Sequence, residues 1–79
     1  MDIPDDLITL ERAAEQARTA LAGLDGAAYT AQWERWRDAA GVFQAAVTAH
    51  AEATGQSRVE VEMAVKKTVR WPEPETAEA

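Results

Sequence analysis

The fold is decided by residues 29–50, which read YTAQWERWRDAAGVFQAAVTAH and repeat seam positions at alternating steps of four and three. This spacing is typical of the a/d seam of a heptad-patterned helix. Asp25 precedes the repeat as a good N-cap residue and Gly55 follows it as a good C-terminal stop, so we predict a helix over residues 26–54. The seam positions are Tyr29, Trp33, Trp36, Ala40, Phe43, Val47 and His50.

The preceding segment has a matching seam, which predicts a helix over residues 3–23. Pro4 suits the opening turn of a helix, and Asp5 and Asp6 suit the positive end of its dipole. A connection as short as residues 24–26 forces the two helices to run antiparallel. We therefore predict an all-α fold built on an antiparallel two-helix hairpin that resembles a coiled coil. The first seam consists of Ile3, Leu7, Leu10, Ala14, Ala17, Leu21 and Leu24.

Folding the chain back at the turn sets the two seams in register. Leu7 then lies near Val47, and Leu10 lies near Phe43. Near the turn, Ala17 meets Trp36 and Leu21 meets Trp33, so both tryptophans are expected to be buried.

Residues 58–70 fit a helix or a strand by their pattern. Ser57 and Glu60 form a capping box, and Val61, Val65 and Val69 recur at helical spacing. Alternate valines and Met63 also fit a strand. We favour a short third helix because a lone strand has no pairing partner and no use for a capping box. Residues 1–71 would form one helical domain, and the acidic, proline-containing residues 72–79 would form a disordered tail.

Composition narrows the function classes. The chain has 79 residues, a formal net charge of −6, no cysteine and one histidine. Disulfides, thiolate zinc sites and cysteine nucleophiles are thereby excluded. The negative charge disfavours general binding to nucleic acid or anionic membrane. We expect a non-enzymatic protein without cofactor or metal, because the sequence shows no catalytic or metal-binding constellation. We expect no membrane association because no apolar run is long enough to span a bilayer, and a cytoplasmic location because the N-terminal residues lack the pattern of a secretory signal.

Two motifs have both a chemical and a structural interpretation. His50 is the one candidate acid or base, but its seam position favours a half-buried structural histidine. Residues 33–37 interleave tryptophan with arginine, as some nucleic-acid interfaces do. We favour core tryptophans beside solvated arginines that pair with Glu34 and Asp38.

Two surfaces are candidates for binding a partner. The first is the basic group of the third helix, with Lys66, Lys67 and Arg70 near its C-terminal end; the whole set comprises Arg58, Lys66, Lys67, Arg70 and Trp71. These residues would either contact a protein partner, with Trp71 as an aromatic anchor, or simply place positive charge at the negative end of the helix dipole. The second is a stripe of small side chains beside the second seam, available to the third helix or to a second protomer in a homodimer. This alanine stripe comprises Ala39, Val42, Ala46, Ala49 and Ala53.

Residues 51–61 resemble the helix-turn-helix unit of bacterial regulators through Ala51, Gly55 and Val61. The resemblance implies that Ser57, Arg58 and Lys66 lie near DNA. Gln56, Glu60 and Glu62 depart from the family pattern, and the two glutamates would repel phosphate.

The whole chain is similar to short uncharacterised actinobacterial proteins that share three motifs. These are the start Ile3-Pro4-Asp5-Asp6-Leu7, the tryptophan pair followed by Arg37, and the end Val65-Lys66-Lys67-Thr68-Val69-Arg70. The leading hypothesis is a non-enzymatic interaction or regulatory protein, and the alternative is a DNA-associated regulator. An acidic mimic of nucleic acid is disfavoured because both signs of charge are mixed along the helices.

Overall fold

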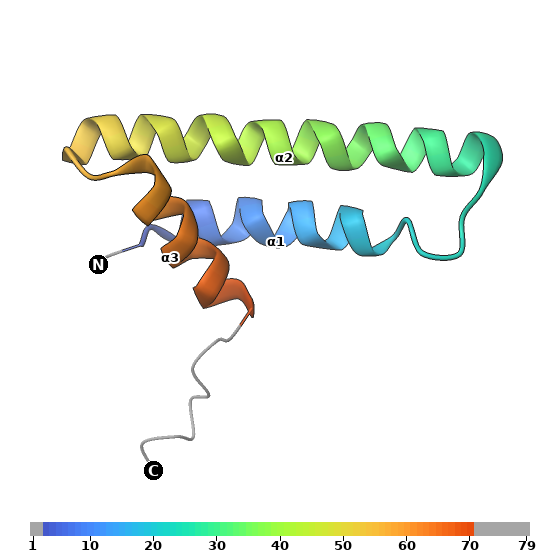
Figure 1. Ribbon diagram of the computed structural model, residues 1–79, viewed down its shortest axis with the longest axis horizontal. Helices are drawn as coiled ribbons and strands as arrows, with labels where there is room; N and C mark the ends of the chain where they lie inside the picture. The colour runs from blue at the N-terminus through green and yellow to red at the C-terminus, as the bar shows by residue number, and fades with distance from the viewer. Residues whose placement is uncertain (1–2, 71–79) are drawn as a thin grey trace, which may run out of the picture.

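The computed structural model describes residues 3–70 of the chain, and within them three helices and no strand occur. They are α1 (Asp5–Thr19), α2 (Gly26–Thr54) and α3 (Arg58–Arg70). Helices α1 and α2 lie side by side and run in opposite directions, and α3 crosses them near the end where α1 begins and α2 ends (Figure 1). None of these helices combines the length and apolar character that crossing a membrane requires. The expected disordered tail at 72–79 lies outside the described residues.

Helix α1 is shorter than the seam predicted. Pro4 occupies the N-cap position in an extended conformation, and Asp5 and Asp6 form the first turn. After Thr19 the backbone tightens, because Leu21 donates to the Arg18 carbonyl and Ala22 donates to that of Thr19. These i to i−3 bonds end the regular α-helix four residues before the expected residue 23.

The ends of α2 follow the predicted boundaries. Asp25 is the N-cap residue, although its side chain makes no capping hydrogen bond. Gly55 adopts a φ of 71°, in the left-handed region that suits glycine, and its N–H donates to the Ala51 carbonyl. The turn that follows is short, so α3 must fold back across the hairpin.

The third segment is a helix, as we favoured over a strand. The Glu60 N–H donates to Ser57 Oγ at 3.4 Å, which is half of the predicted capping box. Helical geometry separates the alternating apolar residues: Val61 and Val65 are fully buried, whereas Val59 and Met63 are exposed. The same side chains therefore divide between a docking face and an outer face of α3.

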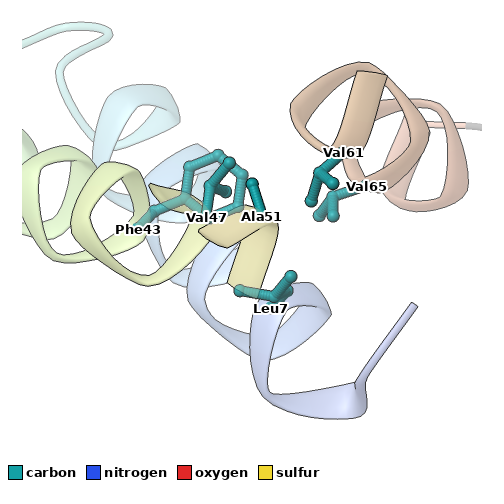
Figure 2. Close-up of a cluster of buried hydrophobic side chains, with 6 residues drawn as sticks. All are labelled: Leu7, Phe43, Val47, Ala51, Val61 and Val65. Carbon is teal, nitrogen blue, oxygen red and sulfur yellow. The ribbon is translucent and has the colours of Figure 1, made fainter. Parts of the chain in front are cut away.

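The core lies at the open end of the hairpin, where all three helices meet (Figure 2). Leu7 of α1 packs there with residues of both other helices. Ile3, Leu10, Ala46 and Val69 pack around the cluster. The buried members are Leu7, Phe43, Val47, Ala51, Val61 and Val65.

The loop half of the hairpin differs from the expectation that both tryptophans are buried. Trp33 is 38% exposed, Tyr29 is 42% exposed and Trp36 is half-buried. The prediction of a buried seam is therefore wrong here. The physical reason is that α1 stops at Thr19 and that, within residues 3–70, α3 reaches only the open end, so no third helix packs over this part of the hairpin.

Candidate functional site

Arg58, predicted to face a partner, lies against α2. Its Nε donates to Thr48 Oγ1 at 3.0 Å, Nη1 donates to Glu62 Oε1 at 3.2 Å, and Nη2 donates to Gln44 Oε1. The Gln44 amide in turn donates to Glu62 Oε2 at 3.2 Å. The guanidinium therefore ties α3 to α2 across the hairpin corner.

Lys66 reaches across to α1, although its side chain stays 39% exposed. Its Nζ lies 3.4 Å from Glu11 Oε2 and 5.5 Å from the centroid of the Phe43 ring. Glu11 is only 4% exposed, and a buried carboxylate needs such a cation because desolvation of an unpaired charge is very costly. Sequence reasoning missed Glu11. The available signal was its position four residues after Leu7 and three before Ala14, on the buried face of the helix.

Arg70 lies beside a second ion pair of α1. Together with Glu11, Glu15, Lys66 and Val69 it lines a pocket of about 210 Å³ between α1 and α3. The hydrogen bond from Arg18 (Nε to Oε2, 2.8 Å) lowers the pKa of Glu15. Burial opposes this shift, and the positive charges of Arg18, Arg70 and Lys66 support it. Lys66 of α3 thus pairs with a carboxylate of α1, and Arg70 lies close enough to Glu15 for its charge to act on that carboxylate.

Lys67 belongs to the outer face of α3, which we define as Val59, Met63 and Lys67. These residues follow one another at steps of four, and Val59 is 61% and Met63 65% exposed. Among the described residues, a hollow of about 430 Å³ runs beside this face and is lined by Met63, Ala64, Lys66, Lys67 and Arg70. Trp71, which we expected to join this basic group, lies outside the described residues.

The alanine stripe of α2 is not the surface on which α3 docks. Val42 is 55% exposed, Ala49 and Ala53 are exposed, and Ala39 is half-buried. Ala46 alone of the stripe packs against the core cluster. Helix α3 uses the neighbouring face of Phe43, Val47 and Ala51.

His50 is half-buried at the open end of the hairpin. Its Nε2 is buried and has no hydrogen-bond partner among the described residues. No group of three or more histidine, aspartate or glutamate side chains in residues 3–70 is arranged to hold a metal ion.

The tryptophans near the loop are held by aromatic and cationic contacts. The rings of Trp33 and Trp36 meet edge to face with centroids 6.4 Å apart, and Arg37 lies 5.3 Å from the Trp33 ring centroid. Arg37 also pairs with Asp38 at 3.8 Å, as the sequence predicted. These contacts order the side chains but leave Trp33 accessible.

Comparison of the chain with protein-family models, with curated proteins and with solved structures gives no match.

Proposed function

We propose that this chain is a small, non-enzymatic protein-interaction module that binds a partner protein through the outer face of α3. The observation that carries the proposal is the exposure of Met63 and Val59 on a helix whose other face is fully buried. Apolar side chains of this size, grouped and rimmed by charge, are typical of protein-binding surfaces.

The charge beside this face indicates the chemistry of the partner. Lys67 belongs to the outer face of α3, and Arg70 lines the adjoining hollow. Both are basic side chains in a chain whose net charge is −6. An apolar anchor flanked by carboxylates would complement Met63 and the two cations. Such a segment could come from a helix of another cytoplasmic protein, the compartment that we expect for this chain.

The alternative function, a DNA-associated regulator, has less support. Of the residues that would lie near DNA, Arg58 already binds Gln44, Thr48 and Glu62, and Lys66 binds Glu11. Releasing both cations for phosphate contacts would break the ties that hold α3 on the hairpin. The exposed Glu60 would also face the phosphates.

Affinity capture from a lysate of the native host, with and without nuclease, tests the proposal. We expect a stoichiometric protein partner that survives nuclease and is lost with Met63→Glu or Lys67→Glu. The matched control is Val42→Glu, which adds the same charge at an exposed valine on α2 and should leave capture intact. Equal loss with the control would contradict the outer face as the binding surface, and recovery of nucleic acid would favour the DNA alternative.

A further inference from the structure

The positive charge of Lys67 on the outer face of α3 has no carboxylate beside it in the described part of the chain. Lys67 is exposed, and within residues 3–70 it takes part in none of the ion pairs. Its described neighbours one helical turn away are Met63, Ala64 and Arg70, and none of them is acidic. The nearest of these charges is the like charge of Arg70, so a carboxylate next to Lys67 would stabilise this end of the helix.

The hollow beside this face sets the chemistry of an occupant. It has a volume of about 430 Å³, and its floor is formed by Met63 and Ala64. Met63 is 65% exposed. On the rim, Lys66 already pairs with Glu11, whereas Lys67 does not pair with any described carboxylate. An occupant that fits must therefore bring apolar groups to Met63 and a carboxylate to Lys67.

The sequence that follows α3 has this chemistry. Residues 71–79 lie outside the described residues, and they read WPEPETAEA. We call residues 72–79 the acidic segment, because they contain three glutamates and no basic side chain. Along this segment Pro74 and Ala77 stand on either side of Glu75. Apolar groups thus flank a carboxylate at the spacing that the hollow requires.

The acidic segment begins at the hollow. Arg70 is the last residue of α3 and also lines the hollow. Pro72 has no N–H to donate and disfavours helical geometry at Trp71, so we expect the chain to leave the line of α3 here. Met63 lies seven residues before Arg70, about 10 Å along the helix. An extended chain covers this distance in about three residues, so residues 73–77 are long enough to run back over Met63.

We propose that the acidic segment docks on the outer face of α3 of the same chain, with Glu75 paired with Lys67 and with Pro74 and Ala77 covering Met63. A single exposed ion pair is weak. A tethered segment is nevertheless present at an effective concentration in the millimolar range, so a contact too weak for a free peptide becomes populated.

The docked segment would regulate the outer face. It offers the apolar and acidic groups that we expect of the partner protein, so the partner must displace it. This competition rests on the proposed function, whereas the contact between the acidic segment and α3 does not.

A spin label on the full chain tests the contact. The chain has no cysteine, so Ala79→Cys provides a single attachment site for a nitroxide. We expect relaxation enhancement at the Met63 methyl group and at the Val59 amide, because the docked segment runs back along α3. Combining the label with Glu73→Gln and Glu75→Gln should reduce the enhancement at Met63 at least about 3-fold, since two attractive charges are lost.

The matched control neutralises two exposed glutamates of α2 by Glu34→Gln and Glu52→Gln. This variant changes the net charge by the same amount and should leave the enhancement at Met63 intact. Enhancement that does not respond to Glu73→Gln and Glu75→Gln, or that falls equally in the control, overturns the proposal. Enhancement seen on isotope-labelled copies mixed with spin-labelled ones assigns the contact to a second copy and overturns docking within one chain.

Affinity capture separates this proposal from the proposed function. If the acidic segment competes with the partner, Glu73→Gln and Glu75→Gln should raise recovery of the captured protein at least about 3-fold, as removal of a tethered competitor does. Recovery that stays unchanged overturns the competition. If the spin label shows the contact and no protein is captured, docking is supported and the proposed function alone fails.

Discussion

At the scale of single residues, the buried carboxylate of Glu11 decides how tightly α3 is held. Lys66→Met removes the cation 3.4 Å from Glu11 Oε2 and leaves that buried carboxylate unpaired. We expect the free energy of unfolding to fall by about 2 kcal/mol, because an unpaired buried charge loses its solvation without compensation. Urea denaturation followed by circular dichroism measures the change.

The double variant Glu11→Leu/Lys66→Met is the control for that interpretation. Removing both charges and keeping apolar volume should restore most of the lost stability, since buried pairs are often replaceable by apolar side chains. If the double variant were as unstable as Lys66→Met, the loss would come from the packing of the lysine stem over Phe43 and not from the unpaired charge.

A second residue-scale prediction concerns pH. Hydrogen bonding from Arg18 holds the pKa of Glu15 below its ordinary value of 4.5. A carboxylate with a lowered pKa contributes stability above its unfolded pKa, and the contribution is lost as the pH falls through the folded pKa. Glu15→Gln should therefore destabilise slightly at pH 7 and have no effect near pH 2. A variant effect that grows in acid would contradict this linkage.

At the scale of elements, the end of α2 depends on one glycine conformation. Gly55 has a φ of 71° and Gly41 lies within α2, and at both positions a Cβ meets open space. Gly55→Ala should cost about 1 kcal/mol because alanine resists the left-handed region. Gly41→Ala should instead stabilise by about 0.8 kcal/mol through helix propensity. Thermal melts of the two variants should move in opposite directions, and a shared direction would refute the backbone explanation.

The elements also differ in how far the sequence defined them. Helix α3 was predicted with the observed bounds because a capping box starts it and helical spacing continues to Val69. Helix α1 was predicted too long because its seam residues continue past Thr19. A heptad pattern reports which side chains would share a face, but it does not fix where the backbone stops being helical.

At the scale of the whole molecule, stability is concentrated at one end of the hairpin. Phe43 is 1% exposed and packs in the cluster that joins all three helices, whereas Trp36 is half-buried near the loop. Phe43→Ala should cost about 3–5 kcal/mol, comparable to the entire stability of so small a domain. Trp36→Ala should cost about 1–2 kcal/mol, less than a fully buried tryptophan would. Equal losses in chemical denaturation would contradict a core confined to the open end.

The sequence by itself determined the helical class, the caps of α2, the third helix and the pairing of opposite charges at Arg37 and Asp38. These features depend on neighbours within about one helical turn, and local spacing records such neighbours directly. The tertiary structure alone decided that Arg58 and Lys66 bind α2 and α1, that Glu11 is buried, and that Trp33 stays open. Arg58 bonds to Thr48, ten residues away along the chain, and Lys66 pairs with Glu11, fifty-five residues away. The roles of these residues therefore depend on where α3 crosses the hairpin. That crossing is set by side-chain packing between helices, which no local pattern records.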